Sequence, residues 1–351
     1  MPTLEEILRV AKDAEASDVH ITVGLPPKMR VFGRLLTMDY PRMMPADTLE
    51  LCLEIMSPMQ RERFEERGEY DMSVSMPELG RYRVNVFKQR GSVALSLRVV
   101  GTEIPTSESL GVPASVADLY NRKRGLVLVT GPTGSGKSTT LASVIDKINL
   151  NRDCHIITLE EPIEYLHPHK MSMVNQREVG LDTHSFADAL RAALREDPDV
   201  ILVGEMRDFE TISIAITAAE TGHLVLSTLH TVDAASTVDR IIDVFPPHQQ
   251  QQIRVQLANV LEAIVSQQLL PNVNEDGRVA SFEVLHANHA VRNLIREGKT
   301  HQIQSIMQTN RKAGMITMDD ALIQLYMNRQ ITKDSAIKFA QDPILMQSKL
   351  Y

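Results

Sequence analysis

GPTGSGKST, residues Gly131 to Thr139, matches the phosphate-binding loop pattern GxxxxGK[ST]. The apolar residues 126–129 before it predict a buried strand, and residues 140–145 after it predict a helix. A strand, this loop and a helix in succession favour a phosphate site over a glycine-rich turn that binds no ligand. We expect the entire loop to contact a nucleotide: Gly131, Pro132, Thr133, Gly134, Ser135, Gly136, Lys137, Ser138 and Thr139.

The residue types in this loop suit a polyphosphate. Its glycines lack the Cβ atoms that would keep backbone N–H groups from curling around an anion, and the helix that follows points its positive dipole end at the same place. Lys137 is predicted to contact the β- and γ-phosphates of ATP. The hydroxyl of Ser138 is predicted to hold Mg²⁺.

A second acidic motif, DVILVGE at residues 199–205, is an apolar strand that ends in Glu205. A carboxylate at a strand end beside the loop can bind Mg²⁺ directly or through water, or it can polarise the attacking water. The alternative is an acid that caps a helix after the strand. We predict the metal and catalytic roles for Glu205.

Three carboxylates lie in the segment EEPIE at residues 160–164, at the end of another predicted strand. Such a cluster is costly unless a cation or arginines face it. One of these acids is expected to be the general base of hydrolysis, and Glu164 is our choice.

His223 and His230 lie at the two ends of an apolar strand over residues 224–229. At about 3.3 Å per residue these ends are roughly 20 Å apart, which disfavours a shared metal ion. We predict that His230 senses the γ-phosphate or a subunit contact. A hydrogen-bonded structural histidine is the alternative for each of the two. His167–His169 is interpreted as a solvated loop.

Composition disfavours several classes of function. The chain has 351 residues, with 37 Lys and Arg against 45 Asp and Glu, for a net charge of −8. This acidity argues against nucleic acid as the main partner. The two cysteines have no CxxC spacing, which suits a reducing compartment. The acidic start and the lack of a long apolar run predict no signal peptide and no integral membrane segment, so any membrane role would be peripheral.

The first part of the chain predicts a separate domain. Thr3 and Glu6 form a capping box that opens a helix. Short strand-like runs follow at residues 20–23, 29–32, 82–87 and 93–100, with a helix near residues 46–56. Residues 1–100 are therefore expected to form an α+β domain, and the segment at residues 101–119, which contains several Gly, Pro, Ser and Thr residues, is expected to be a linker.

The second part predicts the nucleotide-binding core. In residues 120–270 apolar strands alternate with helices, which is typical of a doubly wound parallel sheet. Residues 271–351 are predicted to be helical.

Four ordered segments resemble the secretion ATPase superfamily, the hexameric motors of type II secretion and type IV pili: GPTGSGKSTT, LEEPIEY, EDPDVILVGEMRD and TGHLVLSTLHT. In that superfamily they are the Walker A, Asp, Walker B and His boxes. Further stretches are similar to the PilT family, the twitching-motility pilus retraction ATPases: SDVHI at residues 17–21, RYRVNVF at 81–87 and AVRNLIREGK at 290–299. The similarity covers residues from about Leu4 to Ile337.

The resemblance implies an α/β fold in which a PAS-like N-terminal α+β domain precedes a RecA-like P-loop ATPase domain with a helical C-terminal region. It implies ATP and Mg²⁺ as cofactors and a homohexamer with ATP between domains and neighbouring subunits. The expected place is the cytoplasm, peripheral at the inner face of the cytoplasmic membrane. The expected partners are the inner-membrane pilus platform protein and an accessory retraction ATPase.

The resemblance also assigns roles to four arginines, which we expect to lie on the strands of the first domain. Arg83 and Arg98 match family positions for catalysis, and Arg81 and Arg90 match positions that bind nucleotide phosphates. A guanidinium fork neutralises the charge that develops on the transferred phosphoryl group. The alternative is a row of surface arginines on half-exposed strands.

These residues are compatible with three alternative functions. The first is a pilus retraction motor, and the second is an accessory PilU-like retraction ATPase or an assembly ATPase of the same superfamily. The missing four-cysteine motif argues against an assembly ATPase. The third is a non-catalytic or nucleic-acid-acting P-loop protein, which the intact loop and the 4% aromatic content disfavour. One departure from the family is Glu161, where Asp is common, so this carboxylate reaches one methylene further.

Residues 290–299 are the segment that distinguishes retraction motors. Its apolar residues are spaced to share one helical face: Val291, Leu294 and Ile295. Its basic residues are expected to project elsewhere and to couple hydrolysis to force: Arg292, Arg296 and Lys299. The alternative is an amphipathic helix that only caps the sheet.

Overall fold

The structure is a computed structural model that describes residues 2–101 and 103–350. Met1, Thr102 and Tyr351, which belong to the predicted first domain, linker and C-terminal region, lie outside the described residues. Within the described ranges no helix is both long enough and apolar enough to cross a membrane.

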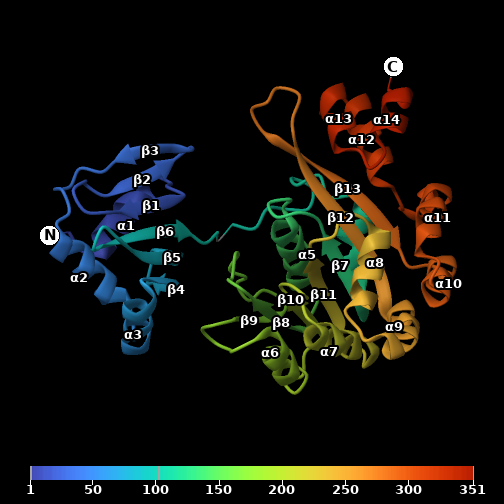
Figure 1. The fold of residues 1–351 in the computed structure, drawn as a ribbon, viewed down its shortest axis with the longest axis horizontal. Helices are drawn as coiled ribbons and strands as arrows, with labels where there is room; N and C mark the ends of the chain where they lie inside the picture. The colour runs from blue at the N-terminus through green and yellow to red at the C-terminus, as the bar shows by residue number, and fades with distance from the viewer. Residues whose placement is uncertain (1, 102, 351) are drawn as a thin grey trace. The chain divides into compact units, whose positions relative to one another are not determined.

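Contacts divide the chain into two compact units. The first comprises Met1–Glu103 and Glu164–Leu166, and the second comprises Ile104–Ile163 and His167–Tyr351. Most of the first unit is blue in Figure 1, and the second runs from green to red.

The first unit combines helices with one antiparallel sheet, as its pattern predicted. Among its described residues the sheet has six strands in the order β3-β2-β1-β6-β5-β4. The helices are α1 (Leu4–Asp13), α2 (Pro45–Ile55) and α3 (Pro58–Arg67). The strands are β1 (Asp18–Ile21), β2 (Lys28–Val31), β3 (Arg34–Thr37), β4 (Glu69–Met76), β5 (Gly80–Gln89) and β6 (Ser92–Val99).

The start of α1 follows directly from its sequence. Thr3 and Glu6 form the predicted capping box, in which each backbone N–H donates to the other side chain, at 2.9 and 3.2 Å. The residues on one face of the helix are all buried: Leu4, Ile7, Leu8 and Ala11. The core of the first unit therefore begins at its first helix.

Arg90 and Gly91 join β5 to β6 in a tight turn. Both have positive φ, 49° and 78°, and the strands pair up to Gln89 opposite Ser92. Two left-handed residues in succession give the hairpin turn whose twist matches the strands. Arg90 therefore lies in a turn, which corrects the prediction that it lies on a strand.

The second unit has one mixed sheet with helices on both faces (Figure 1). Over its described residues the sheet has seven strands in the order β13-β12-β7-β11-β10-β8-β9, and every neighbouring pair is parallel except β12 and β13. The strands are β7 (Gly125–Thr130), β8 (His155–Glu160), β9 (Met173–Glu178), β10 (Val200–Val203), β11 (Leu224–Leu229), β12 (Leu261–Pro271) and β13 (Arg278–His286).

The helices of this unit follow the strands and then form the C-terminal part. They are α4 (Ala114–Ala117), α5 (Lys137–Asn151), α6 (Phe186–Ala193), α7 (Phe209–Glu220), α8 (Ala234–Asp243), α9 (Pro247–Val260), α10 (His289–Glu297), α11 (Ile303–Thr309), α12 (Met318–Met327), α13 (Lys333–Phe339) and α14 (Pro343–Lys349). Short 3-10 helices lie at Asp118–Asn121, Thr300–Gln302 and Arg311–Ala313.

Successive side chains of β7 enter two different cores. Leu126 and Leu128 pack with residues of α6 to α11, whereas Val127 and Val129 pack on the other face with residues of α5. Because the side chains of a strand alternate between faces, a strand covered on both sides is apolar at every position. This is why the continuous apolar run before the loop predicted the strand.

The prediction that the chain is helical after Pro271 is wrong for its first part. β13 follows and pairs antiparallel with β12, with Pro271 opposite Arg278. The predicted boundary between residues 270 and 271 therefore cuts through a hairpin. Two buried polar side chains on β13, Ser281 and Glu283, interrupt the apolar pattern and concealed this strand.

Candidate functional site

The phosphate-binding loop connects β7 to α5 and packs against β12. A Cβ atom on Gly131 would lie 2.2 Å from the carbonyl oxygen of Gln267, and one on Gly136 would lie 2.9 Å from its side-chain amide nitrogen. Both glycines have positive φ, 141° and 89°. Gln267 is buried and accepts a hydrogen bond from the hydroxyl of Thr140 at 2.8 Å. Only the strand register brings Gln267 to the loop, so no local pattern could have revealed it.

Lys137 is buried at the start of α5. Its Nζ donates hydrogen bonds to the carbonyl oxygens of Gly131, at 2.8 Å, and Pro132, at 3.0 Å. α5 begins directly after the loop, so the positive end of its dipole faces the loop, and Ser138 is exposed. A tight glycine cradle, an ammonium group, a helix N-terminus and a hydroxyl together fit a nucleotide polyphosphate with Mg²⁺.

Glu205 and His230 meet at the same edge of the sheet. Glu205 lies just after β10 and His230 just after β11, and His230 Nε2 is 3.1 Å from Glu205 Oε1. Arg207, which sequence reasoning missed, forms an ion pair with the same oxygen. Burial acts to raise the pKa of Glu205, but Arg207 and His230 lower it below its usual value. Glu205 is therefore a carboxylate at neutral pH.

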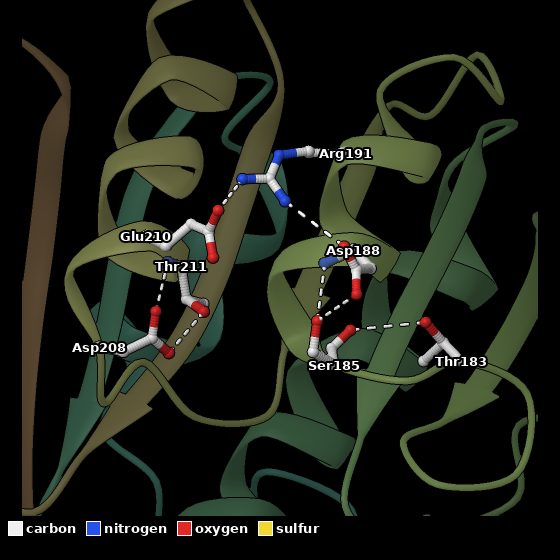
Figure 2. Close-up of polar contacts among 7 residues, drawn as sticks. All are labelled: Thr183, Ser185, Asp188, Arg191, Asp208, Glu210 and Thr211. Carbon is white, nitrogen blue, oxygen red and sulfur yellow. Dashed lines mark hydrogen bonds and ion pairs between the residues drawn. The ribbon is translucent and has the colours of Figure 1, made fainter.

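The segment just after Glu205 is held by the capped start of α7. Asp208 caps α7, because its carboxylate accepts hydrogen bonds from the backbone N–H and the hydroxyl of Thr211, both at 2.8 Å. Arg191 of α6 pairs with Asp188 on its own helix and with Glu210 of α7 (Figure 2). The ion pair with Glu210 therefore joins α6 to the start of α7, the helix that follows Glu205.

A pocket of about 320 Å³ opens beside the phosphate-binding loop. Its lining combines the loop, the turn before α8, the end of β12 and the end of α13: Pro132, Thr133, Gly134, Ser135, Val232, Gln268, Leu269, Lys338 and Phe339. Its mixed apolar and polar lining is typical of a site for an organic ligand. Lys338 and Phe339 come from the C-terminal helices, which the sequence did not connect with the loop.

The carboxylates after β8 occupy different environments. Glu160 accepts a hydrogen bond from the hydroxyl of Thr158 at 2.6 Å. Glu164 is exposed and belongs to the first unit, where the neighbouring N–H of Leu166 donates to the carbonyl oxygen of Gly101 at 3.2 Å. The loop and Glu205 belong to the second unit. The role of Glu164 as general base stays a prediction.

The four arginines fall into two groups within the first unit. Arg83 and Arg98 are opposite one another in the register of β5 and β6, and Arg81 lies at the same end of the hairpin. Arg98 donates from Nε to Asp18 at 2.9 Å. Arg90 lies in the turn at the other end, about 30 Å from Arg81 by strand geometry. A single phosphate group cannot contact both ends, so Arg90 of one subunit cannot share a phosphate with the other three.

His223 lies just before β11, at the amino ends of the parallel strands, whereas the loop lies at their carboxyl ends. Its Nδ1 is 2.9 Å from the carbonyl oxygen of Ala218 and 3.2 Å from the hydroxyl oxygen of Thr221. β11 is parallel to β7, so the end that carries His230 is the end at which the loop begins. These contacts fit the structural alternative for His223, and its place away from the loop disfavours contact with a phosphate of the same subunit. The sensor role of His230 stays a prediction.

The interpretation of His167 as part of a solvated loop is wrong. Its side chain is buried, with 8% of the residue exposed, and burial lowers its pKa to about 4. The backbone N–H of His167 donates to the side chain of Gln176 at 2.8 Å. The polar neighbours Pro168 and His169 are exposed, and they gave the segment its hydrophilic pattern.

His167 should make stability fall at acidic pH. Between the ordinary pKa of about 6.5 and the folded-state pKa of about 4, the unfolded chain binds a proton that the folded chain does not. His167 thus contributes full stability above pH 6.5 and loses it as the pH falls toward 4. From pH 7 to 5 the wild type is expected to lose about 2 kcal/mol more unfolding free energy than His167→Gln, measured by urea denaturation.

Exposed His184 provides the control for this measurement. The variant His184→Gln is expected to follow the wild-type pH dependence. If His167→Gln followed it too, the charge on His167 would not be linked to folding.

The helix α10 confirms the apolar face predicted for residues 290–299 and corrects the prediction for Arg292, while the coupling role stays a prediction. Val291 and Ile295 are buried and Leu294 packs against the same core. Arg292 does not project outward: its guanidinium donates to three carbonyl oxygens and to one carboxylate oxygen. The carbonyl acceptors are Ala258 and Asn259 at the end of α9 and Ala287, which precedes α10, and the carboxylate is that of Glu262 of β12. Arg292 therefore holds α9 to α10, and its loss would damage the fold as well as any coupling role.

Comparison with known proteins extends over nearly the full chain. Residues 1–341 match the family described as Type II/IV secretion system protein. The type IV pilus retraction ATPase PilT of Pseudomonas aeruginosa is 45% identical over 340 residues, which are 97% of this chain and 98% of that protein. The type IV pilus ATPase PilU of the same organism is 44% identical over 336 residues, covering 96% of this chain and 88% of that protein.

A solved structure has the same fold. The crystal structure of the pilus retraction motor PilT with bound ADP superposes with a TM-score of 0.92 and is 51% identical, covering 99% of this chain and 100% of that chain. The α/β fold described above is thus found in a relative with bound ADP.

Proposed function

The chain belongs to the PilT family of type II/IV secretion system proteins, and we propose that this ATPase is the motor that powers type IV pilus retraction in twitching motility. The observation that carries the proposal is the 45% identity to a pilus retraction ATPase over 97% of this chain. The intact loop, with Lys137 buried at its base, supports catalysis rather than a binding role alone.

In the proposed reaction, a water oxygen attacks the γ-phosphorus of ATP and the bond to the ADP oxygen breaks. Lys137 binds the β- and γ-phosphates, and Glu164 accepts the proton that the water loses. Mg²⁺, when bound, would neutralise charge on the phosphate oxygens. Ser138 and Glu205 would hold this ion with water. Mg²⁺ usually keeps several waters and is bound through one or two protein ligands together with phosphate oxygens.

The pocket beside the loop would receive the rest of the nucleotide. Its volume of about 320 Å³ adjoins the loop residues. Phe339 and Leu269 offer apolar surface for a base, and Lys338 offers a cation for the polar part. The C-terminal helices would then contact each nucleotide that the ring binds.

The force-producing cycle would involve both units. In a homohexamer, Arg81, Arg83 and Arg98 would approach the phosphates when the units close around ATP, and hydrolysis would release them. Sequential closure around the ring would turn the inner-membrane pilus platform protein. The motor would then act in the cytoplasm, at the inner face of the membrane, and an accessory retraction ATPase would be a further partner.

The close similarity to PilU keeps an accessory retraction ATPase as the second candidate. Both candidates can be separated in a piliated host that lacks its main and accessory retraction motors. Expression of this chain is expected to restore retraction of fluorescently labelled pili, and Lys137→Ala is the inactive control. Recovery only in a host that keeps its main motor would assign the accessory role. Recovery of surface pili by this chain in a host that lacks its assembly ATPase would indicate an assembly ATPase instead.

A further inference from the structure

Glu283 of β13 joins three separate segments of the second unit. The residue is buried, with 2% exposed. Its Oε1 accepts a hydrogen bond from the N–H of Ala234 at 2.8 Å. Its Oε2 accepts one from the N–H of Met318 at 3.1 Å and one from the side-chain amide of Gln341 at 3.2 Å. Ala234 begins α8, Met318 begins α12 and Gln341 follows α13.

The segments that Glu283 joins form two walls of the pocket beside the phosphate-binding loop. Val232, in the turn before α8, lines one wall, and Phe339, at the end of α13, lines the other. The second wall has a further hydrogen bond, which the Oδ1 atom of Asp319 accepts from the backbone N–H of Gln341 at 2.7 Å. Each wall is therefore attached to Glu283 two positions after a lining residue, since Ala234 follows Val232 and Gln341 follows Phe339.

A carboxyl group at this buried position carries an energetic cost. Burial raises the pKa of Glu283 to about 7, although the hydrogen bonds from Ala234 and Met318 lower it, and the nearby charge of Asp233 adds to the rise. An apolar side chain would avoid this cost, but it could not accept hydrogen bonds from three donors. Glu283 therefore provides three hydrogen bonds that an apolar residue could not make.

We propose that Glu283 is a positioning residue of the nucleotide site, which couples the turn between β11 and α8 to helices α12–α14, so that a movement of one pocket wall on nucleotide binding is passed to the other. His230 lies at the start of the coupled turn, so the coupling extends from the Glu205–His230 pair to the C-terminal helices. This coupling goes beyond pilus retraction and rests only on nucleotide binding at the loop. Failure of the retraction proposal would leave it unaffected.

Hydrogen–deuterium exchange with and without ADP tests the coupling. Glu283→Gln keeps the volume of the side chain, but its amide NH₂ must face at least one N–H donor. In the wild type, ADP is expected to slow exchange in the loop, in residues 231–236 and in residues 318–342. In Glu283→Gln the loop should keep its protection from exchange, while the protection of residues 318–342 should fall at least about twofold. In a separate ATPase assay the KM for ATP should rise about tenfold, with a smaller change in kcat.

A second variant keeps the test decisive if Glu283→Gln misfolds. Gln341→Ala removes the donor that connects the end of α13 to Glu283 and leaves Glu283 bound to both helix starts. A selective loss of protection is therefore expected in residues 333–342, while residues 318–327 stay protected. Gln347→Ala, on the exposed surface of α14, is the matched control and should behave as the wild type. Full ADP-dependent protection of residues 333–342 in Gln341→Ala, or no protection of residues 318–342 in the wild type, would overturn the proposal.

Discussion

Lys137→Ala is expected to abolish ATP hydrolysis and to weaken ATP binding by roughly a hundredfold. The variant removes the only buried ammonium group among the described residues of the loop and its flanking elements. It also removes two hydrogen bonds, to the carbonyl oxygens of Gly131 and Pro132, that shape the loop itself. Phosphate release and titration with a fluorescent nucleotide measure the two effects separately.

Lys147→Ala on the same helix is the matched control. Lys147 is partly exposed and makes an ion pair of 3.7 Å with Glu108, away from the loop. This variant should keep wild-type turnover, and both variants should elute at the wild-type oligomer size. Turnover by Lys137→Ala at the wild-type rate would disprove the assignment of the loop.

The strands around the loop could be predicted because each is covered on both faces. β7, β10 and β11 are buried at every position, so a short apolar run identifies them without knowledge of the rest of the chain. The ends of these strands then place Glu205 and His230 at one edge of the sheet, because parallel strands share their carboxyl ends. The part of the site that lies on parallel strands was therefore accessible from sequence.

Other parts of the site depend on contacts distant in sequence. Gln267 reaches the loop only through the pairing of β12 with β7, and Phe339 reaches it through the packing of the C-terminal helices. The sequence pattern predicted that Arg292 is a surface charge, but the residue is half-buried and donates to carbonyl oxygens at a helix end. An exposed arginine and a half-buried one of this kind have the same sequence pattern. Local periodicity cannot distinguish these cases, since it records the face of a helix and not its acceptors.

Glu205→Gln is expected to lower kcat by two to four orders of magnitude, roughly, while ATP affinity falls much less. The substitution keeps the size of the side chain and removes a negative charge that Arg207 and His230 maintain in the ionised form. Stopped-flow phosphate release gives kcat, and isothermal titration gives the affinity. Glu210→Gln on neighbouring α7 is the matched control, since this exposed acid binds Arg191 and not the site.

The pairing of Glu205 with His230 can be tested by combining substitutions. If the 3.1 Å contact between them makes the two side chains act as one unit, then Glu205→Gln with His230→Gln should lose no more activity than the more damaging single variant. Additive losses would mean that His230 acts on another group, such as a neighbouring subunit. If Glu205→Gln lost ATP binding as completely as turnover, Glu205 would be assigned to support of the nucleotide site. Removal of a group that is needed only for the chemical step lowers kcat but leaves the affinity for bound ATP largely unchanged.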